Sequence, residues 1–229
     1  MVDETVTAKL TAENRRKIGA QVLHYALKPL GHLEFSEIYR LELDTLPEAR
    51  SLQGYKIDRA NERDIDVIVR DLVRDEPPFV IRNLWSQGNH CFVARHEGRV
   101  VAYDWIGFST LQEEEFTITL EPEHAFCLNA YTHPDHRGRG VHYELLRNLL
   151  VFAAANGKTR AYTLVSLFNR DSWKSHIRMG WQRDFTYCYF RPYFVPGRLP
   201  WALTAPRYPA RLNWPQHSWL YPQSAPGVR

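Results

Sequence analysis

The sequence predicts a mixed α/β fold, in which helices cover a sheet of parallel and antiparallel strands. An apolar and aromatic run at 126–131 leads into a glycine turn and then into a helical stripe that begins at Val141. Two strand-like runs at 90–95 and 100–108 precede this unit as a hairpin, and a run that is apolar on both faces follows it at 160–167. Alternating strands and helices of these lengths are typical of one mixed sheet with helices on its faces.

The elements before the glycine turn follow in the order strand, helix, helix and hairpin. Residues 54–59 can form a first strand, and residues 64–73 a helix with Asn61 as its N-cap. Residues 79–85 can form a second short helix, entered through two prolines. A Glu97-Gly98 turn then joins the two strands of the hairpin.

The turn at 133–142, with the sequence HPDHRGRGVH, has the features of an anion-binding loop. Glycine lets the backbone approach an anion, and the N–H groups and dipole of the next helix attract negative charge. The helix is supported by an apolar stripe, and Gly157 can end it in a left-handed conformation. A glycine turn is also a common helix entry without a ligand, so the turn alone is a weak signal.

Two further elements follow that helix. The run at 160–167 predicts a central strand, because it is apolar on both faces. A short helix with polar edges follows at 169–180 and is ended by Gly180. The last strand has two candidates, residues 185–194 or the arm that follows them.

Two motifs in this order resemble the GNAT superfamily of acyl-coenzyme A dependent N-acetyltransferases. The family's pyrophosphate loop reads Arg/Gln-x-x-Gly-x-Gly/Ala, and residues 137–142, RGRGVH, match it except at His142. A family helix carries Asn, then Ala or Ser after three residues, Tyr after seven, and Gly after eleven with an aromatic behind it. At those places this chain has Asn169, Ser172, His176, Gly180 and Trp181. The resemblance covers about residues 54–190.

The resemblance implies a GNAT-like fold with splayed central strands, and with acetyl-coenzyme A as the acyl donor. The pantetheine arm is expected in the gap between the fourth and fifth strands, and the diphosphate on the N–H groups of residues 137–142. Arg137 and Arg139 either contact the phosphates or are solvated helix-entry charges. The residues implied for coenzyme binding are Ala130, Tyr131, Thr132, Arg137, Gly138, Arg139, Gly140, Val141, His142, Asn169 and Ser172.

The resemblance also implies direct transfer of an acetyl group to a primary amine of a small molecule or amino sugar. A neutral amine attacks the thioester, backbone N–H groups stabilise the oxyanion, and an acid protonates the leaving thiolate. His176 stands where many members carry the acid, and an imidazolium is partly populated near neutral pH. The alternative for His176 is a partly exposed helix histidine without a role.

The sequence does not single out a general base. Glu123, just before the fourth strand, and Asn129, which could hold a water, complete the predicted catalytic set with His176. Strand alternation places Asn129 on one face with Cys127 and Tyr131. Each of these side chains also has a packing or surface explanation, and an amine that arrives deprotonated needs no strong base. Other ionisable residues near these strands are Asp104, Glu121 and His124.

His142 is the main departure from the family pattern, which has a small residue there. Three outcomes are open: an additional contact to the anion, a weakened coenzyme site, or no coenzyme at all. The first is the prediction, because the loop keeps its glycines. No metal is expected, since His133, His136 and His142 lack a carboxylate or cysteine partner at a familiar spacing. Cys127 is either a small buried residue, the default, or an acyl carrier.

Composition predicts a cytoplasmic enzyme. The net charge of +3 over 229 residues is too small to indicate nucleic acid as a partner. No apolar run approaches the roughly 20 residues of a membrane span, so stable membrane insertion is not expected. The expected partner is a small-molecule amine, and a homodimer is compatible with the family.

Three regions are predicted: an N-terminal extension at 1–53, the GNAT domain at 54–194, and an irregular arm rich in proline and aromatics at 195–229. The extension contains a basic helix at 11–28 and an extra strand at 35–43, and could be a membrane-surface helix, a lid or, more commonly, a flap packed on the core. The rings of the arm either stack nucleobases or anchor it on the domain.

The function predicted is therefore acyl-coenzyme A dependent N-acetyl transfer. Two alternatives stay open. One is the same fold with a longer acyl donor or a hydroxyl acceptor. The other is a catalytically silent module that binds coenzyme A or a partner.

Overall fold

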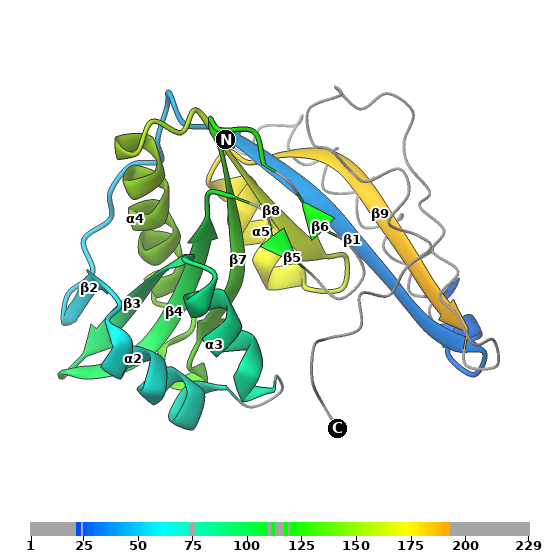
Figure 1. Ribbon diagram of the computed structural model, residues 1–229, viewed down its shortest axis with the longest axis horizontal. Helices are drawn as coiled ribbons and strands as arrows, with labels where there is room; N and C mark the ends of the chain where they lie inside the picture. Colours follow the sequence, from blue (N-terminus) through cyan, green and yellow to red (C-terminus); the bar gives the residue numbers. More distant parts are fainter. Residues whose placement is uncertain are drawn as a thin grey trace, which may run out of the picture.

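The computed structural model describes residues 22–23, 25–73, 77–109, 111–112, 117–118 and 120–192 (Figure 1). The strands are β1 (Gly31–Glu42), β2 (Tyr55–Arg59), β3 (His90–His96), β4 (Arg99–Gly107), β5 (Leu111–Gln112), β6 (Thr117–Ile118), β7 (His124–Thr132), β8 (Arg160–Ser166) and β9 (Gln182–Pro192). The helices are α2 (Glu62–Val67), the π-helix η1 (Ile68–Leu72), α3 (Pro78–Ser86), the 3₁₀-helix η2 (Pro134–His136), α4 (Val141–Ala155) and α5 (Arg170–Arg178). The predicted elements from residue 54 onward are present in the predicted order.

One seven-stranded sheet holds the fold together. Its strand order is β2-β3-β4-β7-β8-β1-β9, and β7 and β8 run parallel while the other neighbours run antiparallel. Helices α2, η1 and α3 cover one face, and α4 and α5 cover the other (Figure 1). The predicted mixed α/β class is confirmed. The two-residue ribbon β5–β6 was not predicted, since strands so short leave no periodic signal.

The N-terminal strand lies inside this sheet. The strand expected at 35–43 is present as β1, but it pairs with β8 on one side and with β9 on the other. It is therefore an interior strand and not a flap on the surface. The sheet thus crosses the boundary drawn after residue 53, and the three-part division of the chain stays a prediction. Most of the helix expected at 11–28 and the arm at 195–229 lie outside the described residues.

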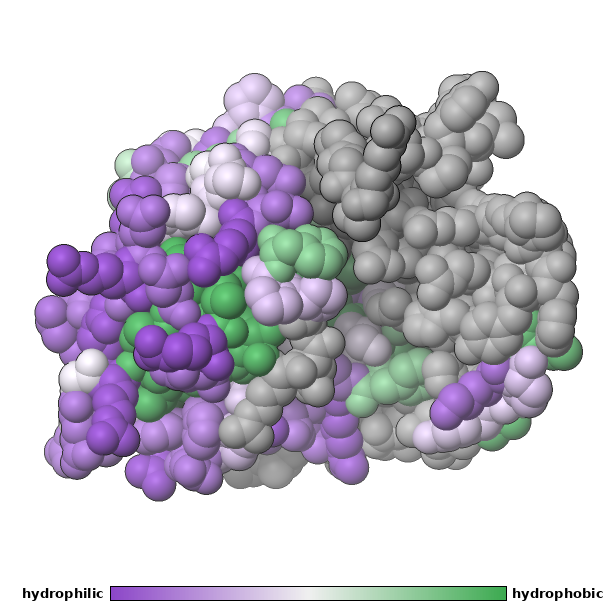
Figure 2. Space-filling model, turned by 60° about the horizontal axis from the view of Figure 1, so that its bottom comes forward, coloured by the Kyte–Doolittle hydropathy of each residue, from purple (hydrophilic) through white to green (hydrophobic). Residues whose placement is uncertain are grey.

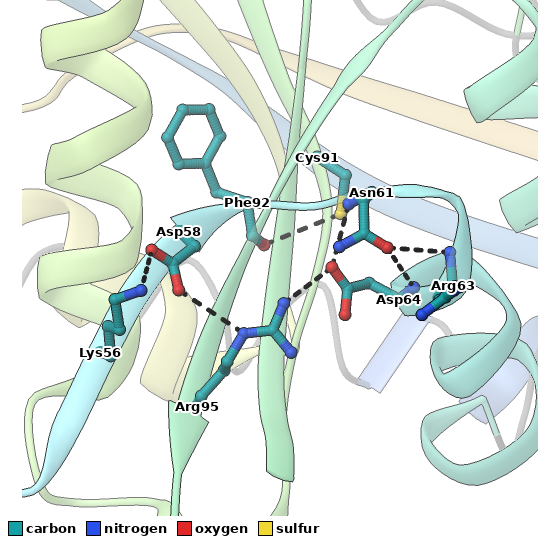
Figure 3. Close-up of polar contacts among 8 residues, drawn as sticks. All are labelled: Lys56, Asp58, Asn61, Arg63, Asp64, Cys91, Phe92 and Arg95. Atoms are coloured by element: carbon teal, nitrogen blue, oxygen red, sulfur yellow. Dashed lines mark hydrogen bonds and ion pairs between the residues drawn. The ribbon is translucent and has the colours of Figure 1, made fainter. Parts of the chain in front are cut away.

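A network of charges fixes α2 against the sheet (Figure 3). Arg95 of β3 donates to Asp64 of α2 at 2.7 Å and lies 3.5 Å from Asp58 of β2. The Asn61 side chain accepts from the backbone N–H of Asp64, and the Asp64 carboxylate accepts from that of Asn61, which completes a capping box. The predicted N-cap is confirmed. Arg95 links the start of α2 to β2 and β3.

The central feature of the sheet is the separation of β7 from β8. The parallel ladder joins His124–Cys127 to Arg160–Thr163 and then ends. Beyond that level β7 stays paired with β4, and β8 stays paired with β1 up to Ser166. We call the divergence between residues 128–132 and residues 164–166 the splay. It is the strand separation that the family resemblance implies.

A β-bulge lies at the start of the splay. Trp105 of β4 pairs with Leu128 and Tyr103 pairs with Tyr131, so one residue of β4 opposes two of β7. Asn129 has a φ of 50°, a left-handed conformation that asparagine adopts more readily than most residues. The predicted alternation is wrong here: Cys127 packs on the α4 side, whereas Tyr131 packs with Leu128 on the α3 side. The extra residue of the bulge shifts the alternation by one.

We expect the Asn129→Val variant to lose about 1–3 kcal/mol of unfolding free energy, because a β-branched residue is strained at positive φ. Asn129→Gly should lose less, since glycine adopts this conformation freely. Both substitutions remove the amide, so the difference between them isolates the backbone. Urea unfolding measures it, and equal losses in the two variants would show that the bulge does not depend on a left-handed residue.

Candidate active site

The glycine loop continues directly from the open end of the splay. After β7, the single turn η2 leads to Gly138 and Gly140, which have φ values of 74° and 83°. Gly140 is the N-cap of the 15-residue helix α4. A Cβ at Gly138 would meet nothing within 4 Å, so glycine is needed there for backbone conformation and not for space. The first-turn N–H groups of α4 have no partner within the helix and form a site suited to an anion.

The side chains around the loop add positive charge. Arg137 donates from Nε to the carbonyl of Thr132 at 2.9 Å, and both Arg137 and Arg139 are exposed. The ring of His136 makes a 2.9 Å hydrogen bond to the hydroxyl of Tyr55. Arg137 therefore bridges β7 and the loop, and its guanidinium remains at the surface.

The segment between β1 and β2 holds the start of α4. Glu144, buried in the first turns of α4, accepts a hydrogen bond from the backbone of Arg50. Tyr143 donates to the carbonyl of Glu48 at 3.1 Å, and Arg147 donates to that of Pro47 at 2.8 Å. The loop that precedes α4 is thus fixed by contacts from a distant part of the chain.

His176 of α5 is buried and is held in one tautomer. Its Nδ1 lies 2.8 Å from the carbonyl of Ser172, an acceptor, so Nδ1 carries the proton and Nε2 has the lone pair. Burial lowers the pKa of His176 to about 4, although the hydrogen bond to Ser172 acts in the opposite direction. The expectation of a partly populated imidazolium near neutral pH is wrong, and so is that of partial exposure, because the ring is removed from water.

Ionisable side chains form a row that runs from β1 to β4 near the splay, with His176 of α5 at its centre. The ring of Tyr39 from β1 stacks on His176 at 6.3 Å, and its hydroxyl donates to the Glu37 carboxylate at 2.6 Å. On the other side, the ring of His142 from α4 lies 5.9 Å from His176, and its Nδ1 lies 3.9 Å from Asp104 of β4. Sequence reasoning missed Tyr39 and Glu37 as site residues, and named Asp104 only as one of several candidates for a general base. The one signal for Asp104 was a carboxylate within an otherwise apolar strand.

The predicted coenzyme residues lie in three groups. Ala130, Tyr131 and Thr132 form the edge of β7 along the splay. The loop residues 137–142 follow at its open end, with the imidazole of His142 turned inward to Asp104. Asn169 caps α5 by accepting from the Ser172 N–H at 3.1 Å, so both have a structural role. Their coenzyme contacts stay predictions.

The other two predicted catalytic residues, Glu123 and Asn129, belong to β7 or to the turn before it, and their catalytic roles stay predictions. Glu123 precedes β7 at the end opposite to the splay, about 20 Å along the strand from Asn129 at roughly 3.3 Å per residue. Asn129 shapes the bulge through its backbone. Burial raises the pKa of the Cys127 thiol well above its ordinary value, which opposes its use as a nucleophile.

Two absences concern the described residues alone. They contain no group of three or more His, Cys, Asp or Glu side chains placed to hold a metal ion. None of the helices in this part of the chain combines the length and apolar character that a bilayer crossing requires. Figure 2 shows a group of hydrophobic residues left of centre with hydrophilic residues around it, and further hydrophobic residues toward the lower right.

Known proteins share this architecture. The model of the acetyltransferase (GNAT) family matches residues 35–181, whereas no curated protein matches the chain significantly. A GNAT-family protein from Novosphingobium aromaticivorans superposes with a TM-score of 0.50 at 18% identity, over 69% of this chain and 63% of its own. A GNAT-family acetyltransferase from Colwellia psychrerythraea superposes with a TM-score of 0.54 at 16% identity, over 70% of this chain and 57% of its own. A fungal GCN5-related glucosamine N-acetyltransferase region superposes with a TM-score of 0.56 at 13% identity, over 73% of this chain and 22% of its own.

The chain spans less than two thirds of the length of each of these structures. At such identities the superpositions show a common fold. The family model, in contrast, covers more than half of the 229 residues, including the splay and the glycine loop. The chain belongs to the GNAT acetyltransferase family.

Proposed function

We propose that this protein transfers an acetyl group from acetyl-coenzyme A to a primary amine of a small molecule or amino sugar, in a ternary complex. The observation that carries the proposal is the continuity of the splay with the glycine loop at its open end. One narrow separation between strands suits an extended pantetheine arm, and the adjacent helix start suits a diphosphate. An amino sugar is included because one structural neighbour is named as a glucosamine N-acetyltransferase region.

His176 handles the proton in this mechanism. The amine nitrogen attacks the thioester carbon, which gives a tetrahedral intermediate with an ammonium and an oxyanion. Neutral His176 accepts the ammonium proton on Nε2, because Nδ1 is already bound to Ser172. When the carbon–sulfur bond breaks, the same nitrogen gives that proton to the thiolate. A single buried imidazole thus serves first as base and then as acid.

A second candidate function is coenzyme binding without catalysis. The inward imidazole of His142 favours it, because this ring lies where the family has a small residue. A silent module would bind the coenzyme, or a partner, but would release no thiol with any amine.

We expect acetyl-coenzyme A binding to depend on the left-handed backbone of the loop. Gly138→Ala should weaken binding at least tenfold by calorimetry, because alanine strains a φ of 74° and distorts the N–H groups. Gly88→Ala is a matched control at a φ of 80°, again with open space, at the end of α3. Both variants should lose similar stability, and equal affinity for the coenzyme would refute the proposed diphosphate site.

We expect His176→Asn to lower kcat by about 10²- to 10⁴-fold, the usual contribution of a general acid or base. The asparagine amide can still donate to the Ser172 carbonyl, so the helix contact is kept while Nε2 is lost. Thiol release with a panel of amines gives the rate, and calorimetry should show coenzyme affinity within about threefold of the native value. Unchanged turnover would remove His176 from the mechanism.

A further inference from the structure

Asp104 presents a buried oxygen for which the fold provides no ordinary partner. The residue is 1% exposed in the middle of β4, and its Oδ1 accepts from the backbone N–H of Trp105 at 2.8 Å. Its Oδ2 has no hydrogen-bond partner among the described residues. A buried carboxyl oxygen in this state is costly and calls for a physical explanation.

The imidazole of His142 lies close to that oxygen. Nδ1 of His142 lies 3.9 Å from Oδ2, somewhat longer than a hydrogen bond. The side chain of His142 is 26% exposed and that of Asp104 is 2% exposed. Because the His142 side chain is partly exposed and that of Asp104 is not, the imidazole forms the accessible side of this pair.

This pair lies at the level where β7 leaves β8. Asp104 is the residue of β4 that opposes the bulge at Asn129 and Ala130. Since His142 belongs to the first turn of α4, its ring lies between the glycine loop and His176. The pair is therefore placed beside the path proposed for the pantetheine arm.

The surroundings favour a pair without net charge. Burial raises the pKa of Asp104 well above its ordinary value, and burial together with His176 lowers the pKa of His142 to about 4. Burial raises the pKa values of the Cys91 and Cys127 thiols, which also interact with Asp104, well above their ordinary value. Tyr39 of β1 donates to Glu37, and Glu144 of α4 accepts from Arg50. A carboxylic acid that donates from Oδ2 to Nδ1 leaves the single proton of a neutral imidazole on Nε2.

We propose that Asp104, in its acid form, fixes His142 in the Nε2–H tautomer, and that His142 donates this hydrogen bond to the thioester oxygen as it becomes an oxyanion. This inference rests on the proposed function. His142 is then a catalytic residue and Asp104 a positioning residue. No proton leaves the pair during the reaction: the amine adds to the carbonyl carbon, the oxygen gains charge and accepts from Nε2–H, and collapse returns the carbonyl as the thiolate departs. His142 and His176 thus carry opposite tautomers, one as donor and one as acceptor.

The tautomers are measured directly by ¹⁵N NMR of the free protein labelled in histidine, with His142→Gln and His176→Asn used for assignment. We expect the proton of His142 on Nε2, that of His176 on Nδ1, and neither ring charged above about pH 5. A proton on Nδ1 of His142, or titration of this ring near its ordinary pKa, would overturn the inference. This readout needs neither coenzyme nor activity, so it can fail while the proposed function holds.

Activity tests the role of the donor. His142→Ala should lower kcat by about 10²- to 10³-fold, as for loss of one oxyanion donor, with coenzyme affinity within about threefold. His142→Gln should recover at least tenfold of that loss, because its amide N–H can reach a similar point. If alanine instead changes coenzyme affinity and leaves kcat intact, His142 is an anion contact or an obstruction, and the inference is wrong.

Asp104 is tested by two substitutions that keep the number and branching of its side-chain heavy atoms. The amide of Asp104→Asn donates as the carboxylic acid does, so this variant should keep kcat within about threefold. Asp104→Leu should lose at least tenfold and shift the His142 tautomer equilibrium. Equal rates in the two variants would contradict the positioning role. If Asp104→Leu does not fold, full activity in a folded Asp104→Asn whose His142 is protonated on Nδ1 would contradict it equally.

Discussion

The end of the β7–β8 ladder after Cys127 and Thr163 is the constraint on which the rest of the structure depends. Two features keep the strands apart beyond that level. The bulge at Asn129 alters the course of β7 while it remains bonded to β4, and β1 holds β8 along its other edge up to Ser166. Because β7 remains paired with β4 and β8 remains paired with β1, the sheet holds together although β7 and β8 separate. The N-terminal strand is therefore part of the site's support.

The two imidazoles near the splay share two properties: burial disfavours their charged forms, and each has a polar neighbour. Burial lowers the pKa of each to about 4. His176 is oriented by a backbone carbonyl, and in the proposed pair His142 is oriented by Asp104. Neutral groups suit a reaction in which an amine must stay unprotonated and an oxyanion forms briefly. Carboxyl groups lie at both ends of the row, Glu37 on β1 and Asp104 on β4, outside the two strands that line the splay.

Local chemistry explains what the sequence could predict. Asn61, Gly98 and Gly157 act within a few residues of their own positions, so the cap and turns they form were predicted correctly. The glycine loop was found for the same reason. Position in the sheet depends on distant pairing, so the interior place of β1 was not visible, nor was Tyr39 beside His176. The bulge inserts one extra residue into β7, which strand alternation does not predict. The lowered pKa values of His142 and His176 follow from burial, and burial depends on the tertiary fold.

The claim that the splay receives the coenzyme is tested most directly by a crystal structure of the protein with coenzyme A. The account predicts pantetheine density between residues 128–132 of β7 and 164–166 of β8, with the diphosphate on the first-turn N–H groups of α4. Density for the ligand elsewhere, or a splay closed by side chains while the coenzyme is bound at another surface, would contradict it.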